Sequence, residues 1–136
     1  MGAWGTDTFE NDTACDWAYG LEGTADLTRV RQALTACVEA GDEYLDADVA
    51  CEALAACEVV ARLKGQSGAR NAYTEPVDAW VAAHPMTPPP DVVALALKAI
   101  DRVHTPPSEL LELWDEEGPN AGWHAAINDL RARVSV

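Results

Sequence analysis

The sequence contains few basic residues and no long apolar run, and each shortage excludes a class of protein. Nine basic residues face 23 acidic ones in 136 residues, which gives a formal net charge of −14. A field of that sign repels phosphate backbones and anionic lipids, so we expect neither direct nucleic-acid binding nor membrane binding. The apolar stretches are interrupted well before the ~20 residues that span a bilayer, which argues against a membrane-embedded chain.

An export signal is also missing, since the opening residues MGAWGTDTF have no basic region followed by an apolar one. We therefore expect a cytoplasmic protein whose thiols stay reduced. Its four cysteines fit small buried hydrophobic residues better than a disulfide framework. Cys51 and Cys57, for example, would lie roughly 9 Å apart along one helix, beyond the ~7 Å limit for a bridge.

Motifs of the commonest enzyme classes are absent: the chain contains no GxSxG, GxxxxGK[ST], HExxH or CxxC. The three histidines, His84, His104 and His124, lie near predicted helix ends, and none has a Cys, Asp or second His at metal-ligand spacing. We interpret them as surface residues or as cations at helix C-termini. The sequence thus predicts no catalytic residue, no cofactor and no metal ligand set, and it favours a protein that is not an enzyme.

What is present is a helical pattern, because apolar residues recur at three- and four-residue spacing along most of the chain. A short helix should follow Asn11 and run to about residue 19, and a second should span about 26–41. The third, at about 44–64, is the longest and the most apolar, so we expect it at the centre of the core.

The second half of the chain continues this pattern between proline and glycine breaks. A fourth helix should carry Pro76 in its first turn, a fifth should span about 91–103, a sixth should be capped by Ser108, and a seventh should follow Gly118. No segment alternates with period two for long enough to predict a strand. The predicted fold class is therefore all-α, a single-domain irregular helical bundle of about six to seven helices over residues 1–136.

The N-terminal segment GAWGTDTFENDTACDW resembles the start of the bacterial family catalogued as domain of unknown function 4259. The segments EALAACEVVARLKG and SELLELWDEEG and a last helix with Trp123 and Leu130 extend the resemblance over nearly the whole chain. The family has no established activity, so the resemblance implies no substrate, cofactor or partner. The residues that define the N-terminal motif are Gly2, Trp4, Gly5, Phe9, Asn11, Asp12, Asp16 and Trp17.

This motif has mainly a structural interpretation. Its glycines allow backbone turns, its first Trp and its Phe are apolar anchors upstream of a helix, and Asn11 or Asp12 can satisfy the free N–H groups of the first turn. The alternative is a surface on which Asp12, Asp16 and the aromatic residues contact a ligand. Glu10 could join these carboxylates in holding a divalent cation.

A second acidic group lies around the sixth predicted helix and consists of Glu109, Glu112, Asp115, Glu116 and Glu117. The last three of these residues lie at the C-terminal end of the helix, where each negative charge costs ~0.3–1 kcal/mol. One explanation is pairing with Arg131 or Arg133 of the last helix. The other is a preformed acidic patch that recognises a basic partner.

These observations favour a non-enzymatic acidic helical module that binds a basic bacterial protein, as a regulatory binder or as the immunity partner of a cationic toxin such as a nuclease. The alternative is a small-ligand or divalent-metal-dependent enzyme or binding protein that uses carboxylates near the N-terminal motif. A third hypothesis is a structural subunit of a larger assembly. The sequence does not specify the oligomeric state.

Overall fold

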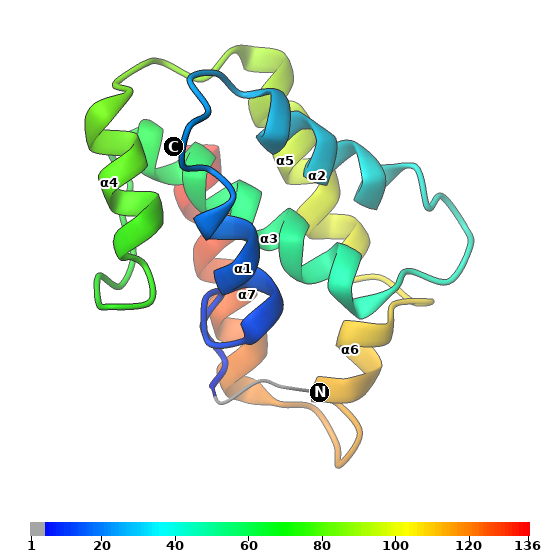
Figure 1. The fold of residues 1–136 in the computed structure, drawn as a ribbon. Helices are drawn as coiled ribbons and strands as arrows, with labels where there is room; N and C mark the ends of the chain where they lie inside the picture. Colours follow the sequence, from blue (N-terminus) through cyan, green and yellow to red (C-terminus); the bar gives the residue numbers. More distant parts are fainter. Residues whose placement is uncertain (1–4) are drawn as a thin grey trace.

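Seven helices form the regular structure of the computed structural model, which describes residues 5–136 (Figure 1). Within those residues there is no strand, which confirms the predicted all-α class. The helices are α1 (Asp12–Tyr19), α2 (Thr28–Val38), α3 (Ala47–Leu63), α4 (Glu75–Ala83), α5 (Pro90–Val103), α6 (Glu109–Trp114) and α7 (Ala121–Ser135).

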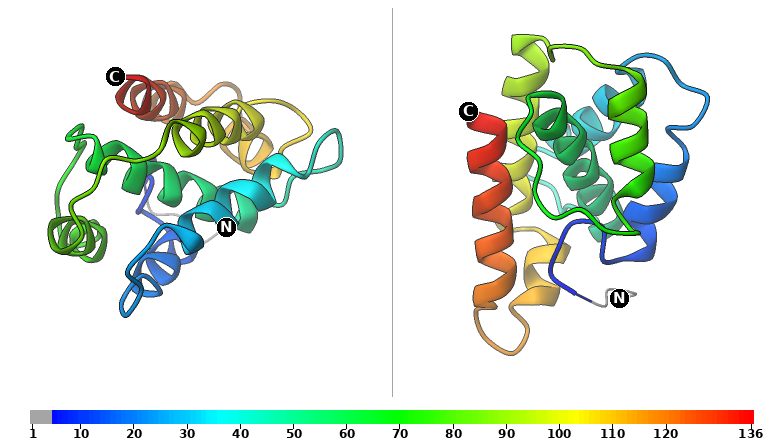
Figure 2. Two further views of the ribbon diagram at one scale, coloured as in Figure 1. Left: turned by 90° about the horizontal axis from the view of Figure 1, so that it is seen from above. Right: turned by 90° about the vertical axis from the view of Figure 1, so that its left-hand side faces the viewer.

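Helix α3 is the central element because most of its circumference is apolar or small. From Ala50 to Arg62 every residue except Glu52 is buried. Its many alanines let neighbouring backbones approach closely, and α3 contacts each of the other six helices. Helix α4 lies on one side of α3, α2 and α5 lie on the other (Figure 1), and α7 runs alongside α5 (Figure 2).

Several helices begin where a side chain satisfies their first free N–H groups. Asn11 accepts a hydrogen bond of 2.8 Å from the backbone of Ala14 and so starts α1. Helix α3 begins three residues later than predicted, because Asp46 is its N-cap and the residue before it is held against the start of α6. There the Leu45 N–H donates to Pro107, and its carbonyl accepts from Glu109.

The start of α6 corrects a second expectation. Ser108 does not cap the helix with its side chain; its buried hydroxyl donates instead to the carbonyl of Val103, at 2.7 Å. The Glu109 carboxylate in turn accepts a hydrogen bond of 2.8 Å from the backbone N–H of Ala47 in the first turn of α3. These contacts tie α5, α6 and α3 together at one end of the bundle.

Candidate functional site

The N-terminal motif divides into buried and exposed residues. Phe9 and Trp17 are buried in the core, while Asp12 and Asp16 point to solvent and Gly5 is half-buried. The motif's Gly2 and Trp4 lie outside the described residues. In the described part the motif therefore starts α1 and anchors it, and only its two aspartates are exposed for a ligand.

A buried charged cluster lies beneath this motif. Glu58 of α3 is 6% exposed, and Arg133 of α7 donates two hydrogen bonds of 2.8 and 3.0 Å to its carboxylate. Arg62, 5% exposed, also pairs with Glu58 and donates to Asp78 of α4 at 2.7 Å. The hydroxyl of Thr8 donates to Glu58 as well, at 3.0 Å, so the motif is docked onto this cluster.

The charged cluster is a structural hub. Its cavity of about 60 Å³ is small, and among the described residues no buried side-chain polar atom lacks a hydrogen-bond partner. Sequence reasoning missed the cluster, although a Glu and an Arg four residues apart inside an otherwise apolar helix are a signal for it.

The structure overturns one explanation of the second acidic group, which we call the α6 acidic cluster: Glu109, Glu112, Asp115, Glu116 and Glu117. Arg131 pairs with Asp101 of α5 at 2.8 Å, and Arg133 pairs with Glu58 and Asp129. Within residues 5–136 no ion pair joins either arginine to the cluster. Both arginines face α3 and α5 instead, because α7 runs alongside α5 with its C-terminal half far from α6 (Figure 2).

The members of the α6 acidic cluster have separate surroundings. Glu109 bonds to the start of α3, and Glu112 accepts a hydrogen bond of 2.5 Å from the hydroxyl of Tyr44. That bond, followed by desolvation and nearby negative charges, raises the pKa of Tyr44 to about 12. Asp115 turns toward α7, and Glu116 and Glu117 are exposed in the α6–α7 connection. The bonded members of the cluster thus contact three different elements: the start of α3, Tyr44 before it, and α7.

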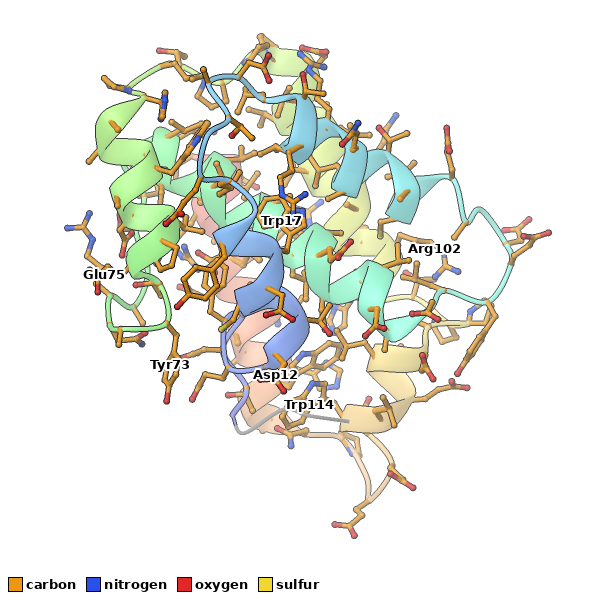
Figure 3. The ribbon with its side chains drawn as sticks, viewed as in Figure 1. Asp12, Trp17, Tyr73, Glu75, Arg102 and Trp114 are labelled. Carbon is orange, nitrogen blue, oxygen red and sulfur yellow. The ribbon has the colours of Figure 1, made fainter. Side chains whose placement is uncertain are left out.

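A different set of carboxylates shares a surface groove, which we call the acidic groove. It lies between the first turns of α1 and α3 and one side of α6, and its volume is about 450 Å³. Leu110, Leu113 and Cys51 supply apolar surface, and none of the described residues that line the groove is basic. Its carboxylates are Asp12, Asp46, Asp48 and Glu109. In Figure 3, Asp12 lies at the lower end of α1, toward α6.

The acidic groove joins residues that the sequence separates. Asp12 comes from the N-terminal motif and Glu109 from the α6 acidic cluster, while Asp46 and Asp48 surround the start of α3. Three helix starts meet here, and acidic residues favour helix starts, so the fold concentrates negative charge at this end of the bundle.

The arginines do not neutralise this charge. Among the described residues only five of the 23 acidic side chains pair with arginine: Glu58, Asp78, Asp91, Asp101 and Asp129. Other arginines bind backbone carbonyls. Arg102 donates to Gly41, Glu43, Thr105 and Pro107, and Arg29 donates to Trp17. None of these arginine interactions involves a carboxylate that lines the acidic groove.

Two histidines also come together, although no second histidine lies at metal-ligand spacing in the sequence. His104 and His124 are joined by a hydrogen bond of 2.6 Å, and His124 contacts Asp115 at 2.9 and 3.0 Å. His84 and His104 do occupy helix C-caps, of α4 and α5. Sequence spacing missed the pair because its members lie 20 residues apart on two different helices.

A family model described as Domain of unknown function (DUF4259) matches residues 2–126. The chain belongs to this family. The match confirms the resemblance seen in the N-terminal motif, and it extends through α6 into α7. No curated protein and no solved structure matches the chain.

The matched region of this DUF4259 domain contains the whole acidic groove and the paired histidines, whereas Asp129, Arg131 and Arg133 follow it. In residues 5–136, no group of three or more His, Cys, Asp or Glu side chains is placed to hold a metal ion. Over the same residues, no helix is both long and apolar enough to cross a membrane. Asp16 is not among the residues that line the acidic groove.

Proposed function

We propose that this DUF4259 domain is a non-enzymatic interaction module that binds a basic protein through the acidic groove. The observation that carries the proposal is a groove of about 450 Å³ whose walls, within residues 5–136, hold four carboxylates and no basic side chain. A formal net charge of −14 adds a long-range field that would steer a cationic partner toward the molecule.

The groove suits a lysine or arginine side chain of the partner. The aliphatic stem of such a side chain could lie against Leu110 and Leu113, and its charged head could reach the carboxylates of Asp12 and Asp48. Glu109 and Asp46 are already bonded to backbone N–H groups of α3. Those bonds fix the acceptors in place before binding, which reduces the entropic cost of association.

The N-terminal motif fits this proposal as a scaffold. Asn11 starts α1 and Thr8 docks the segment onto Glu58, so Asp12 is held at the edge of the groove. The partner would be a regulatory target or a cationic toxin whose basic surface the domain covers. Loss of nuclease activity in the presence of the domain would identify the second case.

The test compares two variants that have the same net charge. Asp12→Asn with Asp48→Asn removes two carboxylates from the groove without removing a cap of α3. Glu22→Gln with Glu75→Gln removes two exposed carboxylates elsewhere; Glu75 lies on α4, at the side of the molecule away from α6 (Figure 3). Each tagged protein is used to capture partners from its native cells, and dissociation constants are then measured with the purified partner.

We expect the wild type and the Glu22/Glu75 control to capture the same basic protein with similar affinity. The Asp12/Asp48 variant should bind it at least tenfold more weakly, because a close charge pair across an interface contributes about 1.5 kcal/mol or more. Equal weakening by both variants would show that only the net charge of the domain determines the affinity. Unchanged binding by the Asp12/Asp48 variant would refute the acidic groove as the binding site. Calorimetric binding of Mg²⁺ without any basic partner would favour the metal-dependent alternative.

A further inference from the structure

Three side chains from three parts of the chain form a continuous line of hydrogen bonds. His104 follows α5, His124 lies in the first turns of α7, and Asp115 follows α6. The Nε2 atom of His104 is 2.6 Å from Nδ1 of His124, whose Nε2 atom is 2.9 Å from Asp115. Trp123 lies edge-on to the ring of His104, with 5.8 Å between ring centroids.

The hydrogens in this line can be counted. The Asp115 carboxylate accepts a hydrogen bond from the backbone of Asn120 and another from His124, and these two bonds lower its pKa. Asp115 is therefore ionised, and Nε2 of His124 carries a hydrogen. The contact between the two rings holds one further hydrogen. In the neutral pair Nε2 of His104 donates it to Nδ1 of His124, and in the singly charged pair either ring can own it.

The imidazole pair can therefore carry no charge or one positive charge without losing its hydrogen bond. A second added proton places an N–H on both of the facing nitrogens, so two donors face each other at 2.6 Å on two positively charged rings. Both rings are only partly buried, so protons from solvent reach them.

The surrounding charges do not compensate for that second proton. On α5 the nearest carboxylate is Asp101, and Arg131 of α7 already binds it at 2.8 and 3.0 Å. In the α6–α7 connection only Asp115 bonds to the pair, while Glu116 and Glu117 are exposed. One carboxylate thus stabilises one imidazolium.

We propose that Asp115, His124 and His104 form a proton-sensitive latch between the end of α5 and the start of α7, closed while the imidazole pair carries at most one charge and open when it carries two. In the open form His104 leaves both His124 and Trp123, whereas His124 keeps its bond to Asp115. The latch is independent of the proposed partner binding.

The experiment is an NMR titration of the intact protein from about pH 8 to about pH 5, which follows the imidazole nitrogens and the tryptophan indole N–H groups. The chain has three histidines, so variants assign every signal. We expect the pair to titrate in two coupled steps separated by about one pH unit or more. The indole signal of Trp123 should move with the lower step.

Two variants and one control make the test decisive. In His104→Gln the lower step and the accompanying shift of Trp123 should both disappear. His84→Gln removes the other C-cap histidine, which bonds to Trp80 at 2.9 Å, and should leave both steps unchanged. If His104→Gln does not fold, Asp115→Asn tests the proposal instead. Loss of the carboxylate should move the upper titration step to lower pH. Two independent single titrations with a stationary Trp123 signal, or an upper step that Asp115→Asn leaves in place, would overturn the latch.

Discussion

Replacing Glu58 by glutamine should destabilise the fold strongly, because Glu58 is the acceptor at the centre of the buried charged cluster. The substitution keeps the size of the side chain but leaves the guanidinium groups of Arg62 and Arg133 facing a neutral amide. Breaking a buried ion pair from one side costs about 3–5 kcal/mol. Asp78 and Asp129 still bind the Nε atoms of the two arginines, so we expect a value near the lower limit, about 3 kcal/mol.

That loss is a large share of the ~5–15 kcal/mol by which domains of this kind are stable. It corresponds to a decrease in Tm of about 12 °C for a chain of this length. Urea unfolding followed by far-UV circular dichroism measures the change in the free energy of unfolding, and calorimetry measures Tm. The matched control is Asp101→Asn, which breaks the exposed pair with Arg131 and should cost only ~0–1 kcal/mol.

Salt separates the two cases further. Between ~0.1 M and ~1 M salt the Debye length shortens from ~10 to ~3 Å, which weakens exposed pairs much more than buried ones. The small effect of Asp101→Asn should therefore vanish at high salt, while most of the effect of Glu58→Gln should persist. A loss below about 1 kcal/mol for Glu58→Gln would refute the role assigned to the cluster.

Three further predictions concern single side chains. The free energy of unfolding should decline as the pH falls from about 7 to about 5. Burial and then the neighbouring imidazole charge lower the pKa of His104 below the unfolded value of 6.5. The unfolded chain therefore binds more protons than the folded chain in this pH range. Urea unfolding of His104→Gln should show a shallower decline with pH, and an equal slope would contradict this. Asn11→Ala should lower the free energy of unfolding by about 1 kcal/mol in the same assay through loss of the α1 cap, whereas Asn11→Asp should keep most of it. A thiol reagent at about pH 8 should label Cys15 first, as followed by mass spectrometry, because the other three thiols are buried. Burial, followed by nearby carboxylates, also raises the pKa of Cys51 to about 12. Early labelling of Cys51 would contradict this prediction.

The helices could be predicted because their signals are local. The cap at Asn11, the proline at the start of α4 and the apolar spacing of α3 each act within a few residues of the helix that they define. The start of α3 was placed too early for the opposite reason. Leu45 is held extended by Pro107 and Glu109, which lie more than 60 residues away in the chain.

The side chains of each candidate site are distant from one another in sequence, so local signals do not predict which of them meet. The α6 acidic cluster looked continuous in the sequence, yet Glu109 faces the start of α3 while Asp115 faces α7. The groove instead combines Glu109 with Asp12, from a motif that had been given a structural role. Only the packing of α1 and α6 against α3 brings these two carboxylates to one surface.

The sequence by itself determined the helical class, the order of the helices, the family and the negative charge. Periodicity, caps and motifs are properties of short segments, and the net charge is a sum over all residues. The tertiary structure decided which charges are neutralised. Arg62 and Arg133 pair with Glu58 in the interior, where an unpaired charge is most costly, whereas no cationic side chain of the described part of the chain lines the acidic groove. The tertiary structure also placed His104 against His124, since two helix ends meet in space according to how the core packs and not according to their separation in the chain.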